Sequence, residues 1–292
     1  MRARTARALI QQRRPIRWNS GFGLGLTVVL LTMLCFLWIY PFLWLVSASL
    51  KNSLDIFSSG LNLVPHPVRW GNYLRAWVTA GFGHYMLNTI LITVATVILV
   101  VVRCALAGYV LGRYAFLGRR VIFGILIATL FVPTGYTIIP VVQLANTLHL
   151  LNSLWGVIFA LAGGGHVADI LLFAGYFNQL PKELEEAALL DGAGFLAVFR
   201  QVMLPLSGPV IATVTILTFL SAWNDFFVPL VFTFSRPDLR TLAVGMLSFV
   251  GEHETDWSGM AAAATLSLLP VVLLFFFLQR HFIEGIAGAV KS

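Results

Sequence analysis

The chain of 292 residues has little charge. Asp, Glu, Lys and Arg together make up 11% of it, whereas soluble domains contain about 25%. Hydrophobic residues reach 59%, more than a soluble globule of this size can bury, because much of such a chain must face water. This composition excludes an ordinary cytosolic enzyme. It also excludes a disordered chain, which needs low hydrophobicity and high charge. A polytopic membrane protein remains.

Sequence patterns for catalysis, metal binding and nucleotide binding are also missing. The only two cysteines, Cys35 and Cys104, lie in separate apolar runs, which favours buried free thiols. The six histidines are scattered without ligand spacing. A phosphate-binding loop needs Lys after Gly, and none of the three lysines, Lys51, Lys182 and Lys291, follows a glycine. We therefore expect no catalysis, metal or cofactor in this chain, so any ATP hydrolysis must come from a separate subunit.

The net charge is +7, and the basic residues are unevenly placed. Six arginines lie in residues 1–17, directly before a long apolar run. A basic tail in this position is usually a topology signal, and no folded basic module follows it, so nucleic-acid binding is not expected. We interpret residues 1–20 as a cytoplasmic basic tail and residues 21–292 as a single transmembrane domain.

Long apolar runs set the number of membrane spans. A helix needs about 20 apolar residues to cross about 30 Å of hydrocarbon. Residues 121–168 contain no Asp, Glu, Lys or Arg, which is too long for one helix, and the polar stretch 146–153 is the natural break. The sequence predicts an all-α, polytopic transmembrane helical bundle with six spans, at about 24–45, 85–111, 121–144, 154–177, 206–234 and 257–279.

Six spans put both termini on the same side of the membrane. Thirteen of the 19 Lys and Arg residues then fall on the face with the termini, and five fall on the other face. The positive-inside rule places the richer face in the cytoplasm. We expect a multi-pass protein of a bacterial-type plasma (inner) membrane with both termini cytoplasmic. Channels, secondary transporters, membrane enzymes and permease subunits all fit six helices, so the span count alone does not give the function.

One cytoplasmic loop, residues 178–205, is longer than the other cytoplasmic turns. Pro181 suits the first position of a helix. Acidic residues fill the first turns after it, where the helix dipole favours anions; they are Glu183, Glu185 and Glu186. The turn signal of Asp191 and Gly192 should end this helix.

Two apolar stripes follow the helical period in this loop. Leu184, Ala187 and Ala188 form a small one, and Phe195, Phe199 and Val202 form a second at i, i+4 and i+7. Pro205 then marks the start of the fifth span. On physical grounds the loop is either an elbow packed on its own bundle or a helix offered to a groove on a cytoplasmic partner.

The loop also carries a motif. Glu186-Ala187-Ala188, Gly192, Val202 and Leu204-Pro205, at their fixed spacing, resemble the EAA loop of ATP-binding-cassette (ABC) importer permeases, which have Ile at the position of Val202. Further segments are similar to the carbohydrate-uptake branch of that family, including Tyr40-Pro41-Phe42, Leu106-Ala107-Gly108-Tyr109 and Trp223-Asn224-Asp225-Phe226. The resemblance covers about residues 24–292 and is nearest to the six-span subunit of maltose-type importers. The run of Gly163, Gly164 and Gly165 departs from the family pattern and leaves the shape of the fourth span open.

The resemblance implies a type I importer permease that forms half of a translocation path for a sugar or oligosaccharide. The same machine for a glycerophosphodiester or polyol is an alternative, and a stand-alone secondary transporter or membrane enzyme is one of a different class. The implied partners are a second homologous permease subunit, a cytoplasmic ATPase dimer that holds ATP and magnesium, an extracytoplasmic solute-binding protein, and membrane lipid. The residues implied to couple to the ATPase are Glu183, Glu186, Ala187, Ala188, Asp191, Gly192, Phe195, Leu204 and Pro205.

Polar groups at membrane depth are costly and mark candidate substrate paths. The best candidates are Trp223, Asn224 and Asp225, because an aromatic ring beside hydrogen-bonding groups suits a sugar. A structural hydrogen-bond cluster between helices is the alternative reading. His166 and Asp169 are weaker candidates for the path.

Three other features have expected roles. Arg103, inside the second span, should reach towards the cytoplasmic headgroups. Asn88, at the outer end of that span, is expected to be structural. The acidic stretch 251–257 is interpreted either as a solvated linker or, through the resemblance, as a contact for the solute-binding protein.

Overall fold

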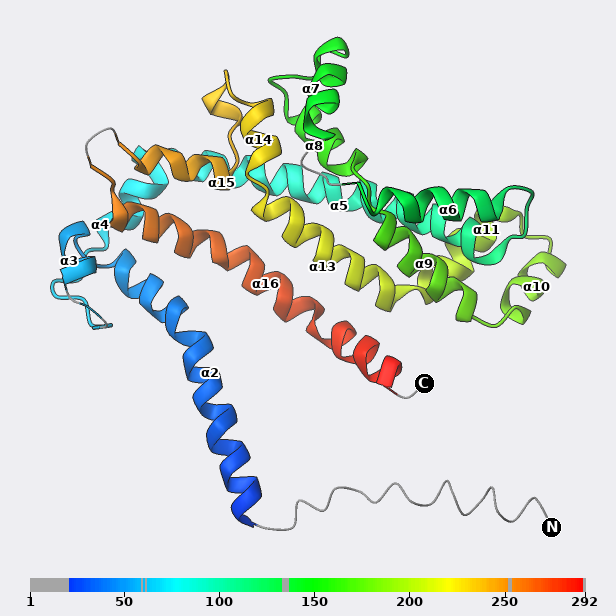
Figure 1. Cartoon of the computed structure of the whole chain (residues 1–292), viewed down its shortest axis with the longest axis horizontal. Helices are drawn as coiled ribbons and strands as arrows, with labels where there is room; N and C mark the ends of the chain where they lie inside the picture. Colours follow the sequence, from blue (N-terminus) through cyan, green and yellow to red (C-terminus); the bar gives the residue numbers. More distant parts are fainter. Residues whose placement is uncertain (1–20, 59, 61, 133–136, 252–253, 291–292) are drawn as a thin grey trace.

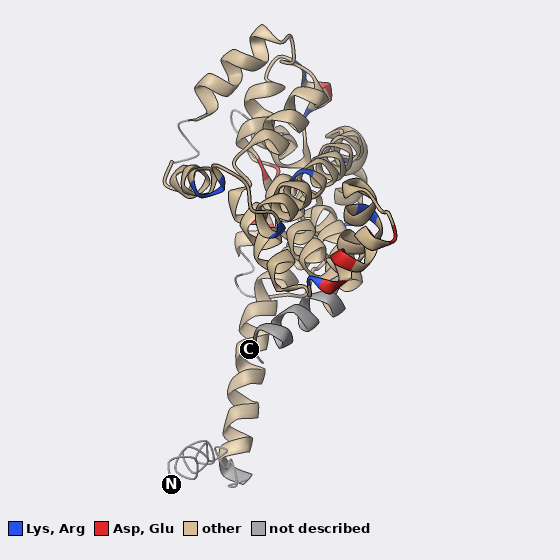
Figure 2. Cartoon of the chain, turned by 90° about the vertical axis from the view of Figure 1, so that its right-hand side faces the viewer, with Lys and Arg blue, Asp and Glu red and all other residues tan. Residues whose placement is uncertain are grey.

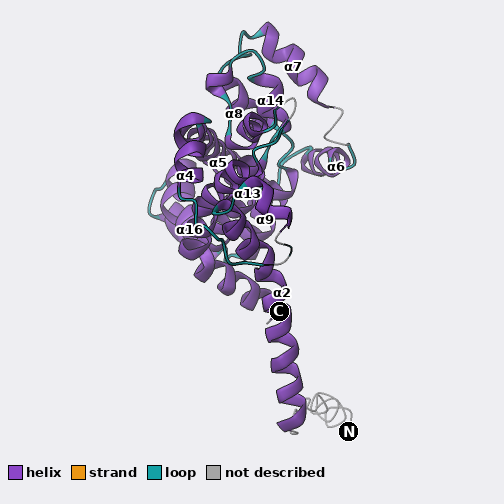
Figure 3. Cartoon of the chain, turned by 90° about the vertical axis from the view of Figure 1, so that its left-hand side faces the viewer, coloured by secondary structure: helices purple, strands orange, loops and turns teal. Residues whose placement is uncertain are grey.

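The computed structural model describes residues 21–290 except for residues 59, 61, 133–136 and 252–253. The basic tail 1–20 lies outside this part. All the regular elements within it are helices, and the only extended pairing is an isolated bridge between Val250 and Thr255 (Figure 3). The expected all-α fold is confirmed.

Three long apolar helices form the frame of the molecule (Figure 1). They are α2 (Gly21–Ser49), α5 (Phe82–Arg113) and α16 (Trp257–Val290). At about 1.5 Å per residue, each exceeds the thickness of the hydrocarbon layer. They correspond to the predicted spans at 24–45, 85–111 and 257–279.

The predicted fourth span is bent. It consists of α8 (Leu154–Gly163) and α9 (Val167–Gln179), which meet at an angle of 55°. The break falls within the glycine run, since α8 ends at Gly163 and the non-helical residues before α9 include Gly164 and Gly165. Arg103 was expected to reach towards the headgroups. In the structure its guanidinium donates a hydrogen bond to the carbonyl oxygen of Gly164, at the break between α8 and α9, at 3.3 Å.

The third and fifth predicted spans are not continuous helices. The region 121–144 is divided between α6 (Arg119–Thr129) and α7 (Ile138–Thr147). The region 206–234 contains α13 (Gly208–Asn224) and the short α14 (Phe227–Phe232).

Local chemistry explains both ends of α13. Pro209 has no backbone N–H to donate to the carbonyl four residues earlier, so the preceding helix does not continue through it. The helical segment Phe195–Leu206 meets α13 at 79°, and α13 starts at Gly208 with Pro209 in its first turn. At the other end, the carboxylate of Asp225 accepts a hydrogen bond from the backbone N–H of Val228 at 2.9 Å and caps α14.

The prediction of six membrane spans is therefore confirmed only in part. Within the described residues, three helices are long and apolar enough to cross a membrane, or up to five if each bent pair counts as one span. Short helices lie at the two ends of the bundle. α3 (Ser53–Ser58), α4 (Gly71–Leu74) and α15 (Leu242–Gly245) lie towards one end, and α10 (Glu183–Leu190) lies at the other (Figure 1).

α5 is the central helix of the packed bundle. Its C-terminal half, with α9, α13 and the segment after α10, encloses a core that includes Tyr109, Phe173, Phe177 and Met203. In contrast, α2 leaves the bundle and contacts it near its C-terminal end, where Ala48 packs with Ile56 of α3 and Ala261 of α16 (Figure 1).

Candidate functional site

The loop 178–205 folds as two helices joined by a tight turn. α10 covers Glu183–Leu190, and a second helical stretch runs from Phe195 to Leu206 with a π-helical turn at Phe199–Met203. Gly192 adopts φ +82°, a left-handed conformation that L side chains rarely take, so glycine permits the reversal between the two helices. The predicted helix–turn–helix is confirmed.

The carboxylate of Glu185 ties α10 to the end of α5. Its Oε1 accepts hydrogen bonds from the hydroxyls of Tyr109 at 2.7 Å and Tyr114 at 2.8 Å. Its Oε2 accepts from Nε of Arg113 at 2.8 Å. The ion pair is largely enclosed, since only 4% of the Arg113 side chain and 12% of the Glu185 side chain are exposed.

Arg113 also binds the backbone that leads into α10. One terminal nitrogen donates to the carbonyl of Leu180 at 2.8 Å and the other to that of Pro181 at 3.2 Å. A third acceptor is the carbonyl of Phe177, at 3.4 Å in the last turn of α9. The Phe177 carbonyl also accepts the backbone N–H of Leu180 at 3.3 Å, so the guanidinium adds a charged donor at the C-terminal end of α9, where the helix dipole favours a cation.

Aromatic rings surround this ion pair. The Tyr109 ring lies 5.3–5.6 Å from the rings of Phe177, Phe195 and Phe199, and 5.4 Å from that of Tyr114. Burial raises the pKa of the Glu185 carboxyl, but hydrogen bonds from the two tyrosines and Arg113 outweigh this, so its pKa lies below the ordinary value. The group is therefore an anion held by three donors.

Apart from Glu185 and Ala188, the residues of α10 are exposed. Glu183, Glu186 and Ala187 are exposed, as is Leu184 at 40%, and Leu190 at the end of the helix is 89% exposed. The small apolar stripe is thus split, because Ala188 packs on the bundle core while Leu184 and Ala187 do not. Figure 2 looks onto this end and shows acidic and basic segments close together there.

The other residues implied to couple to the ATPase divide in the same way. Asp191, Gly192 and Pro205 are exposed, whereas Leu204 packs against the core. Phe195 is 41% exposed, yet its ring lies 5.4 Å from that of Tyr109, tilted by 34°. α10 therefore presents an outer surface, and the residues behind it join it to the bundle.

Two glycines let α5 and α9 approach closely behind the Glu185 site. A Cβ on Gly108 would lie 2.4 Å from Cβ of Phe173, and one on Gly112 would lie 2.6 Å from the carbonyl oxygen of Ala174. Their spacing is the Gly-x-x-x-Gly pattern that allows backbones of membrane helices to pack together. This close contact places Arg113 against the end of α9.

A polar cavity of about 280 Å³ lies at the break between α8 and α9. Thr96 of α5, Thr218 and Ser221 of α13, and His166 are among its lining residues. The Thr96 and Thr218 side chains are 1% and 3% exposed, and within the described residues their hydroxyls have no hydrogen-bond partner. Buried hydroxyls normally find a partner, so these two leave unused hydrogen-bonding capacity in the cavity wall.

His166 and Asp169 meet beside this cavity. Nδ1 of His166 lies 3.0 Å from Oδ2 of Asp169, and its Nε2 lies 3.1 Å from the carbonyl oxygen of Leu161 at the end of α8. The ring therefore bridges the two halves of the broken helix, and one face of the residue lines the cavity.

The three residues predicted for the substrate path do not converge on a common point. Trp223 is buried and stacks on Phe219 at 5.2 Å, and Asn224 donates to the carbonyl of Leu220 at 2.8 Å. Asp225 caps α14. Each of the three makes a local structural contact. They lie at the C-terminal end of α13, after the cavity residues Thr218 and Ser221. Asn88 is also structural, since its amide donates to the carbonyls of Asp238 and Arg240.

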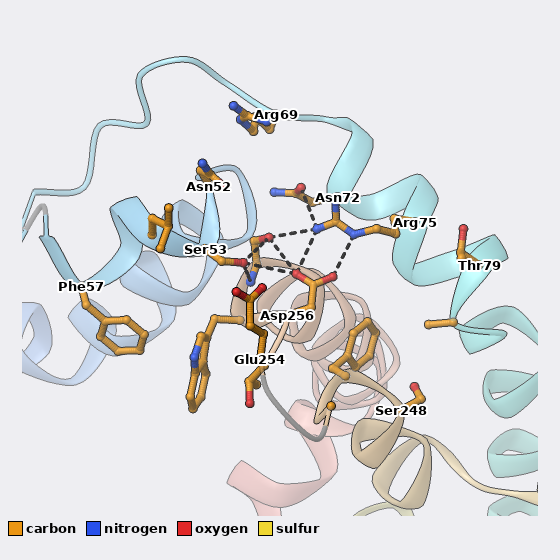
Figure 4. Close-up of a pocket in the computed structure, with 17 residues that line it drawn as sticks. Asn52, Ser53, Phe57, Arg69, Asn72, Arg75, Thr79, Ser248, Glu254 and Asp256 are labelled. Carbon is orange, nitrogen blue, oxygen red and sulfur yellow. Dashed lines mark hydrogen bonds and ion pairs between the residues drawn. The ribbon is translucent and has the colours of Figure 1, made fainter.

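A wider cavity of about 1090 Å³ opens at the other end of the bundle (Figure 4). Arg75 binds both carboxylate oxygens of Asp256, at 2.8 and 3.0 Å, and the Ser258 hydroxyl at 3.0 Å. Ser53 donates to the same carboxylate at 3.3 Å. Part of the predicted stretch 251–257 lines this cavity, whereas Glu252 lies outside the described residues.

Sequence reasoning missed the residues that hold α10 in place. Glu185 was noted only as one of three acidic residues in a first turn, and Tyr109, Arg113 and Tyr114 were not connected with it. One signal was present, because glycines at 108 and 112 predict close helix packing directly before Arg113. The contacts of Glu185 join residues more than 70 positions apart in the sequence, so they could be identified only from the three-dimensional structure.

Long apolar helices, a polar cavity within the bundle, and a short acidic helix exposed at one end together define a membrane transport component. Residues 104–288 match the family described as "Binding-protein-dependent transport system inner membrane component". The chain belongs to this family. It is therefore a permease subunit of an ABC transporter, located in the inner membrane, and ATP hydrolysis belongs to a separate ATPase.

Relatives and a solved structure agree with this assignment. The diacetylchitobiose uptake system permease protein NgcG of Streptomyces coelicolor is 34% identical over 256 residues, 87% of this chain and 83% of its own. The osmoprotective compounds uptake permease protein GgtD of Synechocystis is 34% identical over 276 residues, 92% of each chain. A crystal structure of a bacterial ABC transporter involved in alginate import has a chain with TM-score 0.76 and 25% identity, covering 89% of this chain and 96% of that one.

Proposed function

We propose that this chain forms half of the translocation path of a sugar or oligosaccharide importer and receives the movement of a cytoplasmic ATPase dimer through α10. One observation carries the proposal. α10 is held from behind by Glu185, while its opposite side leaves Glu183, Glu186 and Ala187 exposed with Leu190 at its end. An exposed short helix with apolar and acidic residues suits insertion into a groove on a partner.

The proposed topology has six spans, with the broken segments α6–α7 and α13–α14 completing the count, and both termini in the cytoplasm. The distribution of Lys and Arg supports this orientation. It places α10 in the cytoplasm and the cavity around Arg75 and Asp256 on the outer face, where the stretch 251–257 contacts an extracytoplasmic solute-binding protein. A second homologous permease subunit supplies the other half of the path.

The polar cavity at the α8–α9 break supports a solute with several hydroxyls. Two buried threonine hydroxyls that have no partner among the described residues, and the exposed residue Ser221, line a space of about 280 Å³. We propose that the path runs along α13 from this cavity to Trp223, Asn224 and Asp225. A small solute, such as a polyol or a glycerophosphodiester, is the second candidate, and the similarity to a permease for osmoprotective compounds supports an importer of solutes other than oligosaccharides.

Transport follows from rigid-body movement of packed elements. Closure of the ATPase dimer on ATP displaces α10, and the helices packed on it rock so that the path opens alternately to either face. The chain's own contribution is to hold α10 against α5 and to line the path. ATP and magnesium act on the partner ATPase.

A cross-linking experiment tests the α10 contact. In a background with Cys35 and Cys104 replaced by serine, Leu190→Cys on α10 should cross-link to the co-expressed ATPase. Trp70→Cys is a matched control, because Trp70 is 70% exposed but lies at the opposite end of the bundle. Absence of a product with Leu190→Cys, or equal yield at both positions, would contradict the proposal.

A stimulation assay tests the solute class. The complex in vesicles is given its cognate solute-binding protein together with an oligosaccharide, a polyol or a glycerophosphodiester. Stimulation of ATPase activity by the oligosaccharide supports the first candidate, and stimulation by one of the small solutes alone replaces it.

A further inference from the structure

The attachment of α10 to α5 has a role beyond holding the loop in place. We infer that Glu185 is a positioning residue that makes α10 and the end of α5 one rigid unit. When α10 is displaced, the end of α5 then moves with it by the same amount. The inference rests on the proposed coupling function of α10 and assigns the residue that transmits the movement.

The geometry concentrates this attachment at one carboxylate. All three donors to Glu185 come from six consecutive residues at the end of α5, and both carboxylate oxygens are occupied at 2.7–2.8 Å. Charge-assisted bonds of this length are roughly twice as strong as neutral ones. Because the pair is enclosed, removing one partner would leave a buried charge unpaired, which is strongly unfavourable.

Arg113 extends the rigid unit to α9. The same guanidinium that pairs with Glu185 binds the carbonyls of Phe177, Leu180 and Pro181, which form the end of α9 and the connection into α10. Movement of α10 in either direction therefore pulls on α5 and α9 together. The following turn contacts the bundle through an apolar residue, since Ala193 packs against the same core cluster.

The test separates transmission of movement from simple stability of the fold. Glu185→Gln keeps the size of the side chain and one oxygen for the tyrosines, but its amide group opposes the donors of Arg113. Asp238→Asn is the matched control, because it breaks an Arg–Asp ion pair with Arg236 that is about half exposed and is remote from α10. Both variants are compared with the parent in the reconstituted complex for ATPase binding, ATP hydrolysis and solute imported per ATP.

We expect Glu185→Gln to assemble with the ATPase and hydrolyse ATP, while solute imported per ATP falls at least about tenfold, given the strong penalty of an unpaired buried charge. Asp238→Asn should stay within about twofold of the parent. Equal import per ATP in Glu185→Gln and the parent, with the ATPase bound in both, would overturn the inference. Failure of the parent itself to bind an ATPase would instead refute the proposed function.

A distance measurement gives a readout that stability alone would not change. Spin labels are placed at Leu190→Cys on α10 and Val102→Cys on α5, whose native side chains are 89% and 52% exposed. In the parent, the distance distribution should be the same without nucleotide and with ATP trapped. In Glu185→Gln it should shift between the two states. A parent distance that changes as much as that of the variant would show that α10 and α5 are not one unit.

Discussion

The close approach of α5 and α9 makes a sharp prediction for Gly108→Ala. The new Cβ would lie 2.4 Å from Cβ of Phe173, 2.9 Å from the backbone nitrogen of Ala174 and 3.0 Å from the carbonyl oxygen of Ile170. Carbon atoms in contact are normally about 3.5–4.0 Å apart, so the helices must separate by about 1 Å. None of these neighbours is the mobile end of a side chain, so rotation of a side chain cannot relieve the contact.

The size of the effect follows from two opposing contributions. Overpacking a well-packed core costs about 1–3 kcal/mol, whereas alanine is better than glycine in a helix by up to about 1 kcal/mol. Because the obstructing atoms are backbone and Cβ, the upper part of the first range applies. We therefore expect Gly108→Ala to lower the free energy of unfolding by about 2 kcal/mol.

Detergent-titrated unfolding of the purified protein, followed by tryptophan fluorescence, measures this change. Gly175→Ala on α9 is the matched control, because a Cβ there meets no atom within 4 Å. It should leave the free energy of unfolding unchanged or raise it by about 0.5–1 kcal/mol. The reasoning is refuted if Gly108→Ala is as stable as the parent, or if the control loses as much stability.

Three further predictions concern the other sites. Gly192→Val should destabilise the turn after α10 by about 1–2 kcal/mol through its positive φ and lower import per ATP, whereas Gly194→Ala should not; equal import by the two variants would contradict this. Thr218→Val should leave the fold intact, since its hydroxyl has no partner among the described residues, but raise the solute concentration for half-maximal transport; an unchanged value would remove the cavity from the path. Burial raises the pKa of Asp256, but hydrogen bonds from Gly259, Arg75 and Ser258 outweigh burial, so the pKa lies below its ordinary value. The ionised carboxylate therefore stabilises the fold fully above the ordinary aspartate pKa, and this stabilisation is lost as the pH falls through the lowered pKa. Asp256→Asn should therefore reduce the thermal midpoint at pH 7 but not change the acid limit of the fold below that range; an unaltered midpoint at pH 7 would contradict the role of this network.

Hydrophobicity and turn signals predicted much of the fold. Uninterrupted apolar runs predicted α2, α5 and α16, and Asp191 with Gly192 correctly ended α10 at Leu190. They could not predict the breaks at Thr129 and Asn224, because a run of apolar residues satisfies a membrane span whether or not the helix is continuous. Capping by Asp225 and the restriction imposed by Pro209 are local effects that hydropathy does not contain.

The candidate site was predictable on one side only. The outward residues of α10, such as Glu183 and Glu186, follow from the motif and from helical spacing. The inward attachment depends on which buried carboxylate meets which donors. In the sequence, Glu185 looks like its acidic neighbours. Only the packing of α10 against the end of α5 shows that its side chain, and not theirs, meets Tyr109 and Arg113.

The break between α8 and α9 must also be compatible with a membrane. A helix interrupted at membrane depth exposes backbone N–H and C=O groups that hydrocarbon cannot satisfy. Here Arg103 and His166 bind two of these carbonyls, those of Gly164 and Leu161, and the polar cavity lies beside them. The break thus meets the condition under which a broken helix is tolerated within a membrane, because its freed backbone groups find partners inside the protein or lie beside a cavity.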